Sequence, residues 1–356
     1  MIEILKMNIL IDIGHPGHVH LFKNIAKKLA ANGHSVIFAA RKKSMIISLL
    51  DSLGFPYFIA SKPRTGLIGL FYEMLEHDWH VLKLTLKYKI DLLMGTSVAA
   101  AHISKITRAK SMVFNEDDSD YVKLFAAAAY PFADYIVTPK VLRDTPSKSY
   151  RQHNSYHELA YLHPENFVPN PSILETLGVE EGEKFYILRL VAFKAHHDVG
   201  HGGITPQMQT DLINYLTTTG KVFITMEGEI PEEFAKYQLP LPPDQIHHAL
   251  YYAAMLISDS QTMTMEAAVL GTPAIRYNTF VGRCSVITEL EDKYNLALGY
   301  KPGEEVLFMK KISELNESED TKKLWNNYKE NMLADKEALD HWVINLINKE
   351  IFTKDN

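Results

Sequence analysis

Cysteine is almost absent from this chain of 356 residues, in which Cys284 is the only one. A single cysteine excludes an intramolecular disulfide and any metal site built from several thiolates, which suits a reducing compartment. Long apolar runs are also lacking, so no membrane-spanning helix is expected. Glu3 and Lys6 precede the first strand-like run, and this start does not have a signal-peptide pattern. We therefore expect a cytoplasmic protein.

A strong excess of one charge is missing as well, since the formal net charge is −6. Residues 1–168 nevertheless hold 20 Lys and Arg against 15 Asp and Glu, whereas the remainder holds 17 against 28. A basic N-terminal half favours an anionic acceptor or peripheral contact with the inner face of a membrane, although ordinary variation of surface charge explains it equally well. No stripe typical of nucleic-acid binding is present, so no nucleic-acid partner is expected.

Short apolar runs alternate with helical patterns in the first half of the chain. Asn8–Ile13 has the pattern of a buried strand and is bounded by Gly14. The next segment has one apolar helical face that ends before Gly33, formed by Phe22, Ile25, Ala26, Leu29 and Ala30. Further strands are predicted at Ser35–Ala39, Tyr57–Ala60, Asp91–Met94, Ser111–Phe114 and Tyr135–Thr138.

A second alternation follows an extended hinge, which three prolines predict within His163–Pro171. Strands are predicted at Phe185–Leu190, Lys221–Thr225, Met255–Ser258 and Pro273–Arg276. Helices are predicted at Pro206–Leu216, His248–Ala254, Thr262–Leu270 and in the charged tail Asp320–Ile351. The sequence thus predicts an α/β protein of two Rossmann-like domains, 1–168 and 169–356, each with a doubly wound parallel sheet, and a ligand cleft between the carboxyl ends of the two sheets.

The loop after the first strand combines glycines with histidines. Gly14 and Gly17 let the backbone approach a ligand, and the following helix begins with free N–H groups. His15, His18 and His20 suit acid–base chemistry near neutral pH. A metal site and simple packing or capping of the turn are the alternatives.

A small polar turn between a strand and a helix at Ser258–Pro273 is the second motif. Ser260, Gln261 and Thr262 can direct hydroxyl and N–H groups at phosphate oxygens, and Glu266, one turn on, can accept hydrogen bonds from sugar hydroxyls. A plain N-cap followed by a solvated glutamate explains the pattern equally well.

Arg189 lies in an apolar strand run, where a buried guanidinium requires an anionic partner. A diphosphate and an acidic side chain of the same domain are equally good partners. The loop that follows carries Lys194 and His196 at the place where doubly wound folds hold ligands.

Carboxylates cluster in Asn115–Asp118, after the strand Ser111–Phe114. Clustered carboxylates raise one another's pKa, so Asp117 or Asp118 could act as a general base. They could also bind Mg²⁺ or cap a helix that begins near Asp120, and the cap is the single role that the pattern favours most. A second turn, Gly95-Thr96-Ser97, starts another helix near the same predicted edge.

A long helical insertion at Gly66–Lys89 is rich in Leu, Phe, Tyr and Trp. We expect a core helix there, with an interfacial surface that touches lipid as the alternative.

Together these motifs resemble the GT-B superfamily, which contains nucleotide-sugar glycosyltransferases and UDP-N-acetylglucosamine 2-epimerases, and most closely an uncharacterised family of predicted glycosyltransferases within it. Gly14–His18 is similar to the first loop of the transferase that adds N-acetylglucosamine to the lipid precursor of peptidoglycan. Ser258–Pro273 is similar to the nucleotide-sugar stretch of the superfamily.

The resemblance implies roles for individual residues. His18 would lie near the acceptor or the reacting phosphate. Ser260, Gln261 and Thr262 would contact the diphosphate, and Glu266 the ribose hydroxyls. Arg189, with the loop that carries Lys194 and His196, would neutralise the leaving diphosphate.

The chain also departs from the 2-epimerases. They carry an arginine in the first loop, where this chain has His15 and Pro16, and an acidic residue where it has Thr96 or Ser97. A second epimerase acid would correspond to Glu116 or Asp117. These differences favour the transferase over the epimerase.

Three functions follow, in order of preference. The first is a glycosyltransferase that moves a sugar from a nucleotide diphosphate-sugar, UDP-linked by resemblance, to a glycan or lipid-linked acceptor in polysaccharide biosynthesis. The second is a 2-epimerase or hydrolysing relative, and the third is a nucleotide-sugar-binding module without turnover. No cofactor is expected, because the nucleotide-sugar is a substrate. No metal is expected either, because the resemblance implies an enzyme that needs none and the sequence has no metal-ligand spacing. The sequence predicts no oligomeric state.

Overall fold

The structure is a computed structural model that describes residues 6–180, 182–190, 202–226 and 230–351. It divides into two compact units. Unit 1 comprises Met1–Asn166 and Lys336–Asn356, and unit 2 comprises Phe167–Asp335. The boundary falls within the predicted proline-rich hinge.

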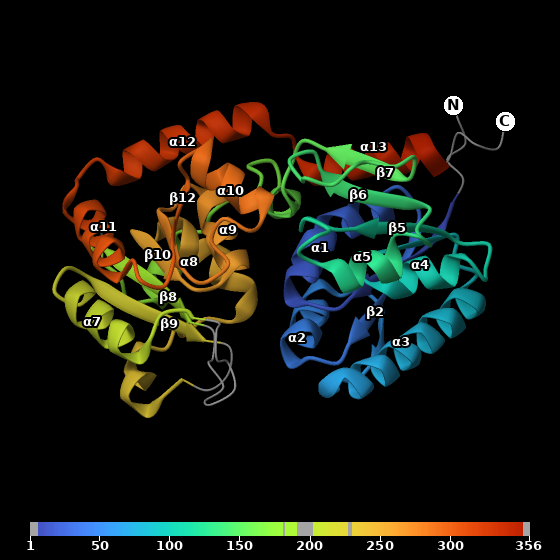
Figure 1. The fold of residues 1–356 in the computed structure, drawn as a ribbon, viewed down its shortest axis with the longest axis horizontal. Helices are drawn as coiled ribbons and strands as arrows, with labels where there is room; N and C mark the ends of the chain where they lie inside the picture. The colour runs from blue at the N-terminus through green and yellow to red at the C-terminus, as the bar shows by residue number, and fades with distance from the viewer. Residues whose placement is uncertain (1–5, 181, 191–201, 227–229, 352–356) are drawn as a thin grey trace. The chain divides into compact units, whose positions relative to one another are not determined.

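Unit 1 is built on a parallel seven-stranded sheet with the order β3-β2-β1-β4-β5-β6-β7 (Figure 1). Its strands are β1 (Asn8–Ile13), β2 (Ser35–Arg41), β3 (Tyr57–Ser61), β4 (Leu92–Gly95), β5 (Lys110–Phe114), β6 (Tyr135–Pro139) and β7 (Tyr150–His153). The strand order reverses between β1 and β4, which is the switch point where doubly wound folds bind ligands. The predicted parallel sheet is confirmed, and the predicted strands match within two residues at each end.

Helices cover both faces of this sheet (Figure 1). They are α1 (Pro16–Ala31), α2 (Ser44–Leu53), α3 (Gly66–Tyr88), α4 (Val98–Ser104), α5 (Lys123–Ala129) and α13 (Leu339–Ile351), with a 3-10 turn η1 (His157–Ala160). The predicted apolar face of α1 is buried except for Ala30, and Gly33 follows the helix with a φ of 89°. That left-handed conformation is one that glycine adopts without strain. The helix expected near Asp120 begins instead at Lys123.

Unit 2 contains a parallel five-stranded sheet with the order β12-β11-β10-β8-β9. Its strands are β8 (Phe185–Leu190), β9 (Lys221–Met226), β10 (Met255–Ser258), β11 (Ala274–Tyr277) and β12 (Ala297–Tyr300). Its helices are α6 (Ser172–Thr176), α7 (Pro206–Leu216), α8 (Ile246–Tyr252), α9 (Gln261–Leu270), α10 (Ser285–Asp292), α11 (Glu305–Glu317) and α12 (Thr321–Asp335), with 3-10 turns η2 (Glu232–Tyr237) and η3 (Pro243–Gln245). The strand order reverses between β8 and β10, so the segments after these two strands flank the switch point.

The tail differs from the prediction. The expected helical stretch Asp320–Ile351 is two helices, α12 in unit 2 and α13 in unit 1, so the second domain does not run to residue 356. The last helix returns to the first unit because it packs there. It contacts α1, and it buries Val343, Leu346 and Ile347. Arg151 and Glu350 join β7 to α13 through two hydrogen bonds of 2.9 and 3.0 Å.

Within the described ranges, no helix is long and apolar enough to cross a membrane.

Candidate functional site

The loop between β1 and α1 folds around its own histidines. His15 caps α1, and its Nδ1 accepts a hydrogen bond from the backbone N–H of Gly17 at 3.2 Å. His18 Nδ1 accepts from the backbone N–H of Gly14 at 3.3 Å, and the two imidazole rings lie 5.7 Å apart. Gly14, His15, Gly17 and His18 are therefore brought together at the carboxyl end of β1.

His18 is held as a neutral imidazole. Loss of solvation lowers its pKa well below the ordinary value, and the charges of His15, His157 and Lys43 lower it further. Thr96, just after β4, contacts the ring with its Oγ1 2.5 Å from Nδ1 and 3.0 Å from Nε2. A neutral histidine at physiological pH can accept a proton, so His18 has the state that a general base requires.

A second set of polar groups lies beside it at the ends of β1, β3 and β4. Asp12 is fully buried, and its Oδ1 lies 2.7 Å from Nε2 of His77 on α3. The other carboxylate oxygen accepts a hydrogen bond from the hydroxyl of Ser97. The Nδ1 of His77 lies 2.8 Å from Oγ of Ser61. Burial opposes protonation of His77, but the carboxylate of Asp12 outweighs it and raises the pKa of His77.

Glu116, after β5, is the carboxyl group of this edge that titrates near neutrality. Loss of solvation raises its pKa to about 7, against the opposing hydrogen bond from the backbone N–H of His157 at 3.2 Å. Burial also lowers the pKa of His157 to about 4, so this imidazole is neutral beside it. The Glu116 side chain is 21% exposed, which leaves the carboxyl accessible to a ligand.

The two predicted aspartates occupy different environments. Asp118 is fully buried, accepts from the backbone N–H of Arg143 at 2.8 Å, and pairs with the guanidinium of Arg143 at 3.3 Å. Asp117 is half-buried, and its backbone N–H donates to Oδ1 of Asn115 at 3.3 Å. Asp118 therefore anchors the loop, whereas the neighbouring Glu116 has the tuned carboxyl group.

In unit 2, the turn between β10 and α9 has the predicted strand–turn–helix form. Ser260 precedes α9, which begins at Gln261, and its backbone N–H donates to Oγ of Ser258 at 2.8 Å. Ser260, Gln261 and Thr262 are half-buried. No side chain of the described part of the chain caps this helix, so its first N–H groups suit an anionic ligand.

Glu266 is more deeply placed than expected. Its side chain is 5% exposed, and Oε1 lies 3.0 Å from Nε2 of His247 on α8. His247 is itself buried. The solvated glutamate, which was the alternative to a ribose contact, is thus wrong, and Glu266 links α9 to α8.

Arg189 is the penultimate residue of β8 and pairs in register with Ser258 of β10. It is 9% exposed, and its Nη1 donates to Oγ1 of Thr225 at 3.2 Å. Arg189 and the α9 turn therefore flank the switch point of this sheet. Lys194 and His196 lie outside the described residues.

Sequence reasoning passed over Asp12 and His77. The signal that was available for Asp12 is a carboxylate within the apolar run Asn8–Ile13, where burial demands a partner. His77 gave no such signal, because it lies 65 residues away on a helix that was expected only to pack. Among the residues that the structure describes, no group of three or more His, Cys, Asp and Glu could hold a metal ion.

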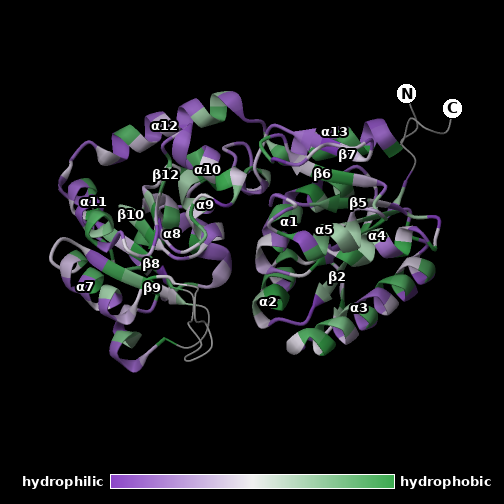
Figure 2. Ribbon diagram, viewed as in Figure 1, coloured by the Kyte–Doolittle hydropathy of each residue, from purple (hydrophilic) through white to green (hydrophobic). Residues whose placement is uncertain are grey.

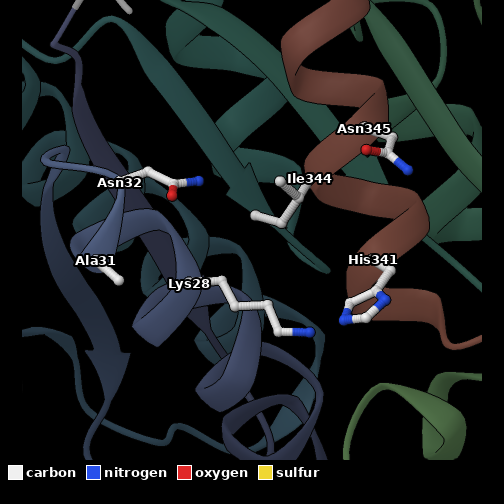
Figure 3. A pocket seen from close by; sticks show the side chains of 6 residues that line it. All are labelled: Lys28, Ala31, Asn32, His341, Ile344 and Asn345. Carbon is white, nitrogen blue, oxygen red and sulfur yellow. The ribbon is translucent and has the colours of Figure 1, made fainter. Parts of the chain in front are cut away.

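A separate cavity lies at the other end of α1, between this helix and α13 (Figure 3). It has a volume of about 360 Å³ and is lined by Lys28, Ala31, Asn32, His341, Ile344 and Asn345. Lys28 is already paired with the buried Asp340 at 2.5 Å. Since α1 begins at the carboxyl end of β1 and runs back along the sheet, this cavity is remote from His18.

Solved structures resemble the chain over nearly its whole length. A UDP-GlcNAc 2-epimerase from Neisseria meningitidis bound to UDP-GlcNAc has a TM-score of 0.70 at 12% identity, with 97% of this chain and 100% of that chain covered. The S. aureus MnaA-UDP co-structure has a TM-score of 0.70 at 13% identity, with 98% of each chain covered. The spinosyn forosaminyltransferase SpnP has a TM-score of 0.66 at 13% identity, with 97% and 99% covered.

At such low identity these similarities concern the fold, and they confirm the predicted GT-B architecture of two α/β units. No curated protein matches the sequence. The model of the family described as protein of unknown function (DUF354) matches residues 7–284, and the chain therefore belongs to this family.

Proposed function

We propose that the chain is a glycosyltransferase that moves a sugar from a nucleoside diphosphate, UDP in the first instance, to a hydroxyl group of an acceptor. The observation that carries the proposal is the presence of two proton-accepting groups at the carboxyl edge of the sheet of unit 1, His18 after β1 and Glu116 after β5. His18 is neutral because its pKa is lowered, and Glu116 titrates near neutrality. Acid–base groups are most effective when their pKa values lie near the working pH, a condition that Glu116 meets, whereas His18 contributes an unprotonated imidazole that can accept a proton.

Each unit has its own part in the proposed reaction. The N-terminus of α9 and Arg189 in unit 2 bind the diphosphate. In unit 1, the neutral imidazole of His18 accepts a hydrogen bond from the attacking hydroxyl of the acceptor and takes its proton, while the ionised carboxylate of Glu116 orients the acceptor through a second hydroxyl group. The acceptor oxygen forms a bond to the anomeric carbon of the sugar while the bond from that carbon to the diphosphate oxygen breaks. The positive end of α9 and the guanidinium stabilise the departing charge.

The buried Asp12–His77 pair has a positioning role in this proposal. Its carboxylate accepts from Ser97 next to Thr96, and Thr96 in turn contacts His18. A fixed network of this kind keeps the imidazole in one orientation between turnovers, so that little reorganisation is needed when the proton moves.

Two of the similar structures support a uridine nucleotide, since one contains UDP and the other UDP-GlcNAc. The second of these is a 2-epimerase, and Glu116 is the acid that keeps epimerisation as a second candidate. An epimerase uses acidic side chains and needs no acceptor. The raised pKa of the accessible Glu116 carboxyl suits either reaction.

Incubation with UDP-N-acetylglucosamine, followed by NMR of the sugar, separates these candidates. Transfer predicts no loss of the donor until acceptor glycans or lipid-linked sugars are added, and then stoichiometric release of UDP. A new sugar signal in the absence of any acceptor would favour the epimerase. Binding of UDP without turnover under any of these conditions would leave only the nucleotide-sugar-binding module, and the transferase would be rejected.

A further inference from the structure

The outer face of α3 carries an unusual amount of exposed apolar surface. Residues that recur about every 3.6 positions place it along one side of the helix, and we call this the α3 stripe: Ile68, Phe71, Tyr72, Leu75, Trp79 and Leu86, each between 46% and 75% exposed. From Ile68 to Leu86 a helix rises by about 27 Å. A continuous exposed apolar stripe of this length is uncommon on a monomeric protein and marks an interaction surface.

The opposite side of α3 is fixed to the body of unit 1. Val81, Leu84 and Thr85 are buried, and Glu73 holds Arg41 of β2 through two hydrogen bonds of 2.5 and 2.9 Å. The α3 stripe is therefore the outward side of a firmly packed helix. In Figure 2, green apolar positions run along α3 between polar ones.

The charged side chains of α3 fall into two groups, carboxylates that have partners and lysines that are exposed. Three carboxylates of α3 have partners: Glu73 pairs with Arg41, Glu76 with Arg64, and Asp78 lies 2.7 Å from Nδ1 of His102. By contrast, Lys83, Lys87 and Lys89 are exposed, and in the described part of the chain none of them pairs with a carboxylate. Lys83 lies over the ring of Trp79 at 4.8 Å, so cation and aromatic ring face the same side.

We propose that the α3 stripe docks on the surface of an anionic phospholipid bilayer. Aromatic rings together with long apolar side chains enter the region between headgroups and acyl chains, and lysines beside them are attracted to anionic headgroups. The unpaired lysines make the stripe complementary to a negative surface and argue against a second copy of the same basic face. The helix lies along the bilayer surface and does not cross it. This proposal does not depend on the proposed catalytic function.

The test is sedimentation of the protein with vesicles of phosphatidylglycerol and phosphatidylcholine, against vesicles of phosphatidylcholine alone. Binding to the anionic vesicles is expected to weaken as salt rises. Two variants should each lower the partition coefficient by more than about tenfold. One is the triple serine variant Ile68→Ser/Phe71→Ser/Trp79→Ser, and the other is Lys83→Glu/Lys87→Glu. Since all five side chains are exposed, thermal melting should stay unchanged.

Val306→Ser/Leu307→Ser is the matched control, because it removes two residues 81% and 58% exposed on α11 of unit 2. It should bind vesicles like the wild type. A blue shift of tryptophan emission on binding should vanish in Trp79→Phe, since the other two tryptophans, Trp325 and Trp342, are buried or half-buried. Equal binding by the serine variant and the wild type would overturn the proposal. Failure of the wild type to bind anionic vesicles at low salt would also overturn it. If the wild type does not bind vesicles and light scattering shows that the serine variant dissociates a dimer, the α3 stripe is a contact between two copies of the chain.

Discussion

The backbone N–H of His157 donates to Oε2 of Glu116 at 3.2 Å, and the Nδ1 of the same histidine lies 3.5 Å from that oxygen. Neither contact compensates for the solvation that the two side chains lose on burial, since the pKa of Glu116 rises to about 7 and that of His157 falls to about 4. The two groups are therefore both neutral over much of the mildly acidic range, and Glu116 ionises as the pH passes neutrality. Ionisation of the half-buried Glu116 therefore lowers the stability of the folded state.

Glu116→Gln should change how the stability of the fold depends on pH. The folded state binds the Glu116 proton more tightly than the unfolded chain, whose glutamate titrates near 4.5, so the wild type loses stability as pH rises from there through 7. Relative to the wild type, the variant should gain on the order of 3 kcal/mol across this window. Urea unfolding at pH 4.5, 6, 7 and 8 measures the difference, and a pH-independent difference would contradict the raised pKa.

The same substitution should change the pH profile of turnover. If the ionised carboxylate orients the acceptor, kcat/KM of the wild type rises through an apparent pKa near 7 and levels off above it. Glu116→Gln should lose this limb and about 10²-fold in kcat. A wild-type profile that falls above pH 7 would show that the protonated form is active, and the assigned role would then be wrong.

His18 should be needed for turnover but not for binding of the nucleotide. His18→Gln is expected to lower kcat by about 10²- to 10⁴-fold, because the amide of glutamine cannot accept the proton. UDP affinity, measured by calorimetry, should stay within twofold, since the proposed diphosphate contacts belong to unit 2. His341→Gln, on the half-exposed face of α13, is the matched control and should retain full activity.

The N-terminus of α9 should account for recognition of the diphosphate. Ser260→Ala/Thr262→Ala is expected to weaken UDP binding at least tenfold, because hydrogen bonds to a charged group contribute about 1.5–3 kcal/mol each, and to leave uridine binding unchanged. Thr205→Ala is the control: Thr205 caps α7 and accepts from Met208 N at 3.3 Å. That variant should lose about 1 kcal/mol of stability but no UDP affinity. Equal effects of both variants on UDP would indicate a general loss of structure.

Most strands could be predicted because buried parallel strands are short apolar runs between turns, as in Asn8–Ile13 and Phe185–Leu190. Two edge strands were missed for the opposite reason. β7 has the sequence Tyr-Arg-Gln-His and β12 the sequence Ala-Leu-Gly-Tyr, so neither is the continuous run of large apolar residues that marks a buried strand. The return of α13 to unit 1 depends on contacts with α1, more than 300 residues earlier, which no local pattern encodes.

The site was predictable where it depends on position and not where it depends on pairing. Strand ends at a switch point identified the loops that hold His18 and Ser260. The state of each side chain depends on partners distant in sequence, such as His247 for Glu266. Asp118 looked like a base within an acidic cluster, but it is buried and pairs with Arg143, which follows β6, while burial raises the pKa of the neighbouring Glu116.

Two glycines at neighbouring strand ends should respond differently to alanine. A Cβ at Gly95 would lie 2.7 Å from the backbone oxygen of Asp12, so Gly95→Ala must push β4 away from β1 and disturb the Asp12–His77 pair. It is expected to destabilise the fold by about 1–3 kcal/mol and to lower activity.

A Cβ at Gly14 meets only the ring of His18 at 3.9 Å, an ordinary contact, so Gly14→Ala should fold normally. If a ligand approaches the backbone there, as the proposed acceptor site requires, Gly14→Ala should raise KM for the acceptor while its melting temperature stays unchanged. Normal KM in Gly14→Ala would place the acceptor elsewhere.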